Sequence, residues 1–239
     1  MLIVHANAIL AEIDRTQQDM DLMAAGATGH LVLGATPSVA ASEVVAIAIA
    51  AVRARFPKVF ITLTEGVLQD IVQQLRLGQL DYVIGRMDAR VSCEALAYDA
   101  LYDDSIRIVA ATDHPLAGKE SVSWADTRPY DWVGLPKGSQ LRSELEFELA
   151  VAAEPSGRVS VETSGVLPTL AIVRKSNLLG LASLRVARVF ANWGVVSMLA
   201  LPYASKSGIG LLSRREVKPT PIGQTFREAI LAAAIDKRT

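Results

Sequence analysis

Four short segments of the sequence place hydroxyl-bearing residues at a helix start that follows a predicted strand. They are Thr36-Pro37-Ser38, Thr64-Glu65-Gly66, Lys137-Gly138-Ser139 and Thr163-Ser164-Gly165. The first N–H groups of a helix lack partners within the helix and lie at the positive end of its dipole. Such starts can therefore bind a carboxylate, a phosphate or a polyhydroxyl group. The alternative is that Ser and Thr only cap their helices. Because four such starts occur in two similar blocks, we favour a binding role.

Two arginines are candidates for the same chemistry. Arg86 follows a predicted strand, and Arg142 lies in the first turn of a predicted helix. A guanidinium at either place can pair with an anionic ligand. The alternative for each is a solvated surface charge.

Catalytic signatures are missing from the sequence. It has no Gly-x-Ser-x-Gly or His-Glu-x-x-His motif, and Gly118-Lys119 lacks the upstream glycine of a phosphate-binding loop. None of the histidines, His5, His30 and His114, occurs in a local catalytic pairing with Cys, Ser or a carboxylate. We therefore expect no enzyme, no cofactor and no metal site.

Composition supports a globular protein with two lobes. The 239 residues are 51% hydrophobic and 21% charged, with a formal net charge of −1. This balance is not typical of a nucleic-acid-binding domain, and the length is enough for two modest cores. A single cysteine, Cys93, cannot form an internal disulfide, which favours a reducing compartment.

Neither membrane insertion nor export is expected. The longest apolar-rich run, Val39–Val52, contains Ser42 and Glu43 and is shorter than the roughly 20 residues that span a bilayer. The N-terminal segment lacks a basic region followed by an apolar one, because polar residues begin at His5. A cytoplasmic location is therefore predicted.

Helices and strands are predicted to alternate in two blocks. The first has strands at 30–35, 59–64 and 80–85 with helices at 37–56 and 67–77 between them, and a long strand at 96–111 follows. The second has strands at 132–135, 158–162 and 178–182 with helices at 139–152, 166–175 and 184–193. Strands at 195–201 and 209–213 and a helix at 221–237 complete the chain. Alternation of this kind predicts parallel sheet pairing with helices on both faces.

The first segment has the spacing of a coiled-coil helix. Apolar or small residues recur in a 4-3-4-3 pattern, at Leu2, Ala6, Ile9, Ile13, Thr16, Met20 and Met23. Gly26 and Gly29 mark the end of this helix. The alternative is an amphipathic helix that packs on its own domain.

Several motifs resemble the effector-binding domains of LysR-type transcriptional regulators. The run from Phe56-Pro57 to Ile84 is similar to their first lobe, His114-Pro115-Leu116-Ala117 to the entry into the second lobe, and Pro219–Phe226 to the closing helix. The heptad segment is similar to the linker helix through which such regulators dimerise. A weaker likeness, including Pro168-Thr169-Leu170, is to the branch of regulators of a galactose-binding protein.

The resemblance implies an α/β, two-lobed type 2 periplasmic-binding-protein-like fold, with mixed sheets flanked by helices and an inducer bound in the cleft. The expected parts are a linker helix at 1–27, a first lobe at 28–108 and 205–239, and a second lobe at 109–204. The family's winged helix-turn-helix does not occur in this sequence, so operator binding is expected only of a longer regulator. Self-association as a dimer or tetramer is also expected.

The resemblance and the helix starts together define the residues expected to bind the effector, which the sequence leaves open as a carboxylic acid or a sugar. These residues are Thr36, Pro37, Ser38, Glu65, Gly66, Val67, Arg86, Lys137, Gly138, Ser139, Thr163 and Ser164. Two other functions remain open. One is a solute-binding protein, which would need an export signal. The other is an enzyme on the same scaffold, for which only Glu65 or Asp70 would be available as an acid or base.

Overall fold

The chain forms two compact units. The computed structural model describes residues 13, 16–17, 20–24, 26–87, 94–137, 139–151, 157–203 and 206–235. Unit 1 comprises Met1–Tyr102 and Gly208–Thr239, and unit 2 comprises Asp103–Ser207. The sequence placed the two crossings after residue 108 and before residue 205. The compact units divide between Tyr102 and Asp103 and between Ser207 and Gly208, each time within a strand.

Unit 1 is built on a mixed sheet. Its strands, in spatial order, are β2 (Phe60–Glu65), β1 (His30–Ala35), β3 (Tyr82–Arg86), β9 (Lys206–Arg214) and the first half of β4 (Leu96–Ala110). β1 pairs in parallel with both β2 and β3, as the strand-helix alternation predicts, whereas β9 runs antiparallel to β3. The helices are α2 (Pro37–Ala40), α3 (Glu43–Arg55), α4 (Leu68–Arg76) and α8 (Pro221–Ile235).

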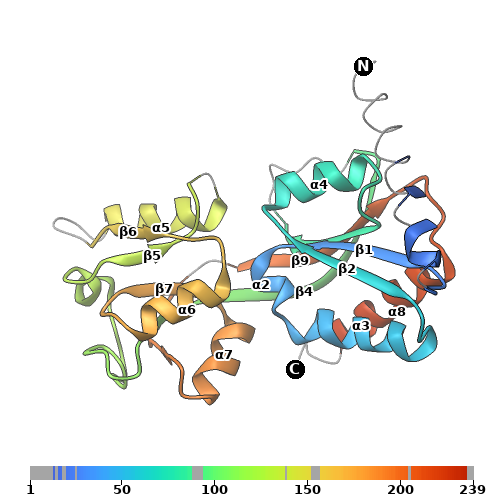
Figure 1. The fold of residues 1–239 in the computed structure, drawn as a ribbon. Coiled ribbons are helices and arrows are strands. Elements are labelled where there is room, and N and C mark those ends of the chain that lie inside the picture. The colour runs from blue at the N-terminus through green and yellow to red at the C-terminus, as the bar shows by residue number, and fades with distance from the viewer. Residues whose placement is uncertain are drawn as a thin grey trace. The chain divides into compact units, whose positions relative to one another are not determined.

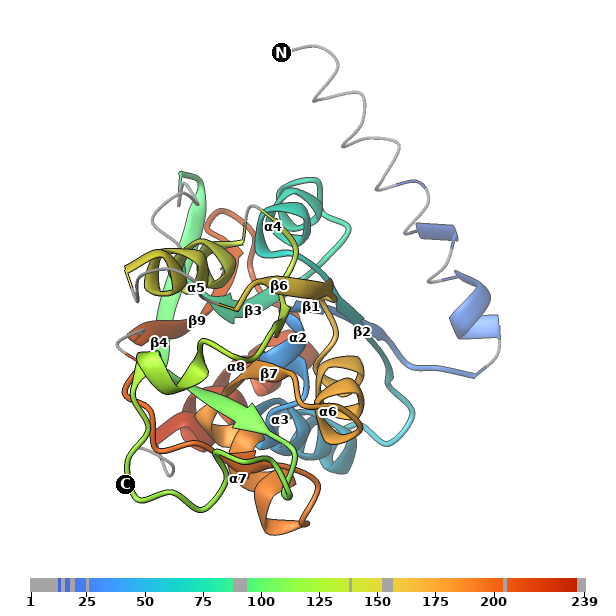
Figure 2. The same cartoon turned by 90° about the vertical axis from the view of Figure 1, so that its left-hand side faces the viewer.

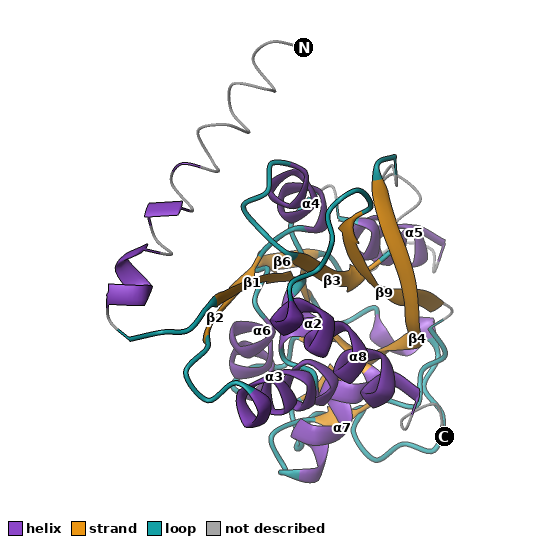
Figure 3. Cartoon of the chain, turned by 90° about the vertical axis from the view of Figure 1, so that its right-hand side faces the viewer, coloured by secondary structure: helices purple, strands orange, loops and turns teal. Residues whose placement is uncertain are grey.

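Apolar helix faces cover both sides of this sheet (Figure 1). On one side α3 and the closing helix α8 lie next to each other (Figure 3), and Val52 and Phe226 belong to the same buried core as Leu33 of β1. On the other side, Ile71 and Leu75 of α4 pack against the sheet. Burial on both faces explains why the central strands are continuously apolar rather than alternating.

The helix expected at 37–56 is wrong as a single element, because the structure breaks it into α2 and α3. Ala41 ends α2, and Ser42 adopts an extended backbone (φ −85°, ψ 147°) as the N-cap of α3. Ser is a preferred N-cap residue, and Glu43 in the next position favours the positive end of the helix dipole. The Ser42 side chain makes no capping hydrogen bond, so the helix is broken by the extended backbone at Ser42 and not by side-chain capping.

Unit 2 is a second mixed sheet. Its strands, in spatial order, are the second half of β4, β7 (Leu179–Ser183), β5 (Trp132–Gly134) and β6 (Val159–Glu162), with β8 (Ser197–Met198) also pairing with β4. Its helices are the 3-10 turn η1 (Trp124–Thr127), α5 (Gln140–Val151), α6 (Val166–Arg174) and α7 (Leu184–Asn192). Figure 2 shows α5 on one side of these strands and α6 and α7 on the other.

The strand expected at 195–201 is largely absent, and η1 was not expected. β8 pairs with β4 only through Met198 and Ser197. The flanking Val196, Leu199 and Leu201 are buried in the two cores of unit 2 without extending the ladder. An apolar run therefore predicted burial correctly here and strand pairing incorrectly.

The described residues at the start of the chain are helical, and Gly26 (φ +88°) follows them. Ile13, Met20 and Met23 of the predicted seam are 58%, 61% and 66% exposed. Leu2, Ala6 and Ile9 lie outside the described residues. Within the described part of the chain, no helix is both long and apolar enough to cross a membrane.

Candidate functional site

In unit 1, several predicted residues meet at the carboxyl ends of neighbouring strands. β1 and β2 end in register, with Ala35 opposite Glu65. The Gly66 N–H donates to the Ala35 carbonyl (3.1 Å), and the Thr36 N–H donates to the Ile84 carbonyl (3.0 Å). These bonds fix Thr36, Glu65 and Gly66 at one edge of the sheet, which is where ligands bind in open α/β folds.

Thr36 is the N-cap of α2, but its side chain does not cap the helix. Its Oγ1 is buried and has no hydrogen-bond partner among the described residues. The side chain lies against Gly85, where an added Cβ would come within 3.0 Å of the Thr36 methyl group. Capping alone therefore does not account for Thr36. Pro37 and Ser38 are half-buried in the same short helix.

The second helix start of unit 1 has fewer polar side chains than expected. Val67, not a hydroxyl residue, is the N-cap of α4 and is 45% exposed, and Glu65 is also exposed. Gly66 is needed for packing, since a Cβ there would lie 2.6 Å from Ile71 Cγ2. Arg86 at the end of β3 is only 8% exposed, so the alternative of a solvated surface charge is wrong for it.

In unit 2, β5 and β6 also end together. Gly134 is the register partner of Glu162, and the Thr163 N–H donates to the Gly134 carbonyl (3.0 Å). Thr163 Oγ1 accepts from the Gly165 N–H (3.2 Å), and Ser139 Oγ accepts from the Arg142 N–H (3.3 Å). These two hydroxyls stabilise the backbone of their own turns.

The remaining predicted residues of unit 2 differ in how they are placed. Lys137 and Ser164 are exposed beside the turns that carry Ser139 and Thr163. Gly138 lies outside the described residues.

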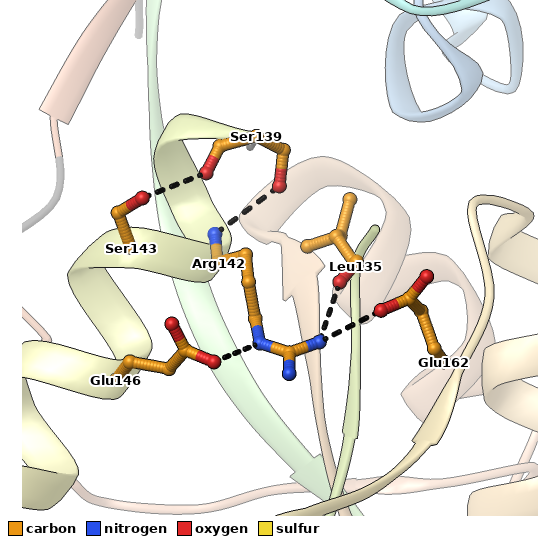
Figure 4. Close-up of polar contacts among 6 residues, drawn as sticks. All are labelled: Leu135, Ser139, Arg142, Ser143, Glu146 and Glu162. Carbon is orange, nitrogen blue, oxygen red and sulfur yellow. Dashed lines mark hydrogen bonds and ion pairs between the residues drawn. The ribbon is translucent and has the colours of Figure 1, made fainter. Parts of the chain in front are cut away.

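The side chain of Arg142 makes three hydrogen bonds at this edge (Figure 4). Arg142 is 5% exposed. Its Nη1 donates to the Leu135 carbonyl (2.9 Å) and to Glu162 Oε2 (3.3 Å), and its Nε donates to Glu146 Oε1 (2.7 Å). Its Nη2 makes no hydrogen bond to any described residue. A solvated surface charge is therefore excluded for Arg142 as well.

Sequence reasoning missed both carboxylates that hold this guanidinium. The spacing of Arg142 and Glu146 is a signal that could have paired them, since residues four apart share a helix face. Glu162 precedes the hydroxyl pair Thr163-Ser164, but only the register of β5 and β6 brings it to Arg142. Ser183, which ends β7 and caps α7, was also missed. Among the described residues, no group of three potential ligand side chains could hold a metal ion.

Most of the chain matches one known protein family. The profile of the LysR substrate binding domain matches residues 24–234. The chain belongs to this family. The LysR substrate-binding domain family is regulatory rather than enzymatic, so the enzyme alternative is not favoured, and neither is a solute-binding protein.

Relatives of this LysR domain are transcriptional regulators. The chain is 24% identical to the HTH-type transcriptional regulator GbpR of Azospirillum brasilense over 97% of this chain and 67% of that protein. It covers 57% of the GbpR of Rhizobium radiobacter, at 27% identity over 72% of this chain. The chain therefore spans a little over half to two thirds of the length of these relatives.

Solved structures share the fold. The regulatory domain of CcmR from Synechocystis PCC6803 has a TM-score of 0.74 at 16% identity, covering 88% of this chain and 99% of that one. The effector binding domain of QuiR has a TM-score of 0.70 at 16% identity, covering 88% and 99%. The type 2 periplasmic-binding-protein-like fold is thereby confirmed.

Proposed function

We propose that this LysR domain senses a small-molecule effector on behalf of a longer transcriptional regulator. The observation that carries the proposal is the family match over residues 24–234. The CcmR regulatory domain is described in complex with 2-PG and the QuiR domain with shikimate, which supports a small-molecule effector for this chain also. The effector would act by binding one state of the regulator more tightly than another, since only that difference in affinity can shift the equilibrium.

The effector contacts that we propose lie at the strand ends of both units. In unit 1 they include Thr36, whose buried Oγ1 has no described partner, and the half-buried Ser38. In unit 2 they include Ser139 and Thr163, with Arg142 added by the structure. Each of these side chains presents a donor or acceptor close to backbone that the strand register holds in place.

Thermal unfolding of the domain with small carboxylic acids and sugars tests the sensing function. A ligand present at a hundredfold excess over its Kd stabilises the domain by about 2.7 kcal/mol. For a chain of this size the expected rise in Tm is roughly 5 to 10 °C. If no compound of either class raises the Tm, small-molecule sensing is contradicted.

Substitution of the proposed contacts locates the site. We expect Ser38→Ala combined with Thr163→Ala to remove the ligand-dependent rise in Tm while the fold is retained. Ser121→Ala is a matched control, because Ser121 is exposed and lies in the segment before η1, not at a strand end. An unchanged ligand response in the double variant would contradict these contacts.

We further propose that the N-terminal helix mediates self-association. Ile13, Met20 and Met23 lie on the predicted heptad seam and are each more than half exposed in the single chain. Large apolar side chains at this spacing are stabilised when a second helix covers them. A second copy of the chain is the expected partner, as a dimer or a tetramer.

Light scattering tests this association. We expect Met20→Glu combined with Met23→Glu to convert the oligomer to a monomer at tens of micromolar. Gln18→Glu combined with Ala25→Glu adds the same charge at the f positions of the predicted heptads, opposite the seam, and should leave the oligomer intact. A wild-type chain that is monomeric, or an equal effect of the two variants, would contradict the proposal.

Operator DNA and a cytoplasmic location belong to the same proposal for the whole regulator. Full-length CbnR is described in complex with its target DNA, and its fold matches this chain with a TM-score of 0.67. A DNA-binding regulator acts where the chromosome is. Binding of a longer form of the protein to operator DNA, altered by the effector, is the expected observation.

A further inference from the structure

The Arg142 cluster of unit 2 consists of Arg142, Glu146 and Glu162. Its guanidinium lies between the two carboxylates, which come from α5 and from the end of β6 (Figure 4). The Arg142 side chain is 7% exposed, whereas those of Glu146 and Glu162 are 52% and 48% exposed. The cluster therefore combines a buried cation with two carboxylates that are open to solvent.

From this cluster we infer that the effector is an uncharged polyhydroxyl compound, such as a sugar or sugar alcohol, rather than a carboxylic acid. The inference rests on the proposed function and names the class of ligand for it.

The charge of the cluster disfavours an anionic ligand. One guanidinium and two carboxylates sum to −1, so the positive charge of Arg142 is already neutralised by partners at 2.7 and 3.3 Å. The exposed Lys137, which precedes α5, carries one positive charge. A carboxylate ligand would have to compete with Glu146 and Glu162 for the guanidinium, and like charges at close range are unfavourable.

The hydrogen-bonding capacity of the cluster favours hydroxyl groups. The side chain of Arg142 is almost fully buried, and its Nη2 donates to no described residue. The ionised carboxylates of Glu146 and Glu162 can only accept. A ligand group that binds here must both accept from Arg142 and donate to a carboxylate. A hydroxyl does both, an ionised carboxylate cannot donate, and an ammonium group cannot accept.

The backbone holds the guanidinium in this position. Nη1 is anchored on the Leu135 carbonyl at 2.9 Å, so the side chain is fixed to the end of β5 as well as to its carboxylate partners. Gly134 leaves room for it, since a Cβ there would lie 3.2 Å from Nη1. Preorganised donors and acceptors of this kind lower the entropic cost of binding.

Matched ligand pairs test the inference. The purified domain is titrated by calorimetry with a panel of hexoses and with the uronic acid of each, which keeps the pyranose ring and carries a carboxylate in place of the C6 hydroxymethyl group. We expect at least one neutral sugar to bind, and its uronate to bind at least tenfold more weakly. A second series of carboxylic acids that are not sugar derivatives shows whether the domain binds acids and not sugars.

Two variants separate ligand selection from a purely structural role. Glu162→Gln keeps the size of the side chain and removes its charge, so we expect it to weaken sugar binding about tenfold and to narrow the difference in affinity between the sugar and its uronate. Glu148→Gln, on the same unit and outside the cluster, should leave both affinities unchanged. A merely structural Arg142 cluster would alter stability without changing the ratio of the two affinities.

Each outcome decides between the proposals. If acids bind and sugars do not, sensing stands and the inference about ligand class is overturned. If Glu162→Gln and Glu148→Gln have the same effect on the affinity ratio, the assignment to this cluster is overturned. If no compound of any class binds, the proposed function fails together with the inference.

Discussion

Arg227 of α8 holds Asp99 of β4 through two hydrogen bonds, from Nε to Oδ2 at 2.7 Å and from Nη2 to Oδ1 at 2.6 Å. The two residues are 128 positions apart in the sequence. The pair attaches the closing helix of unit 1 to the strand that continues into unit 2. The carboxylate and its hydrogen bonds raise the pKa of Arg227. A fork of two parallel bonds requires the planar guanidinium.

We expect Arg227→Lys to lower the free energy of unfolding by about 0.5–1 kcal/mol, because an ammonium group cannot reproduce both bonds and solvent screens this partly exposed pair. Urea unfolding measures the loss. The control is Arg158→Lys, since Arg158 meets Asp131 at 3.8 Å with an 85% exposed side chain. Equal losses of unfolding free energy in the two variants would show that the two parallel Arg227–Asp99 hydrogen bonds add no stability.

His114 makes the stability of unit 2 depend on pH. Burial lowers the pKa of His114, opposed by its hydrogen bond to the Asn177 carbonyl and by Asp113. Its Nδ1 accepts from the Leu116 N–H (3.1 Å), and Nε2 lies 3.2 Å from the Asn177 carbonyl, so the neutral ring satisfies both. Protonation would place a second donor against the Leu116 N–H.

Because the unfolded chain binds this proton more readily than the folded one, the stability contributed by neutral His114 is present above pH 6.5. It is lost as the pH falls through the lowered pKa of the folded state. Unfolding measured between pH 8 and pH 5 should show this decrease. In His114→Asn, where the amide oxygen can replace Nδ1 as the acceptor, the decrease should be smaller. An unchanged pH profile in this variant would argue against His114 as its source.

Ala95 carries a strained backbone. It is the only described non-glycine residue with a positive φ, at 61°, and it precedes β4. We expect Ala95→Gly to stabilise the chain by up to about 1 kcal/mol, because glycine adopts this conformation without a steric cost. Ala97→Gly, within β4, should instead destabilise by about 0.5–1 kcal/mol. Chemical denaturation distinguishes the two, and a destabilised Ala95→Gly would show that the strain is absent.

Gly134 links packing to the Arg142 cluster. A Cβ there would lie 2.7 Å from Val159 Cγ1 and 3.2 Å from Arg142 Nη1, so Gly134→Ala should displace the guanidinium. We expect at least tenfold weaker binding of whichever ligand the calorimetry identifies. Gly180→Ala is similarly crowded, at 2.9 Å from Val173 Cγ2, but away from Arg142. It should lower stability without this loss of affinity, and equal losses would contradict a specific role for Gly134.

The sequence by itself determined most of the local structure. The apolar run at 30–35 matches β1, and the Thr36-Pro37 signal marks the start of α2, because side-chain chemistry at helix starts acts over a few residues. The heptad spacing and the order of motifs were enough to indicate the family. Local signals failed at Ser42, where an extended backbone without a side-chain cap interrupts a continuous helical pattern.

Only the tertiary structure decided which polar groups meet. Arg142 and Glu162 are twenty positions apart, and the parallel register of β5 and β6 sets their 3.3 Å contact. Likewise, Thr36 Oγ1 is buried without a described hydrogen-bond partner where Thr36 packs beside Gly85 of a separate strand. Pairing across strands depends on register and burial, which follow from the packing of the whole unit rather than from neighbours in the chain.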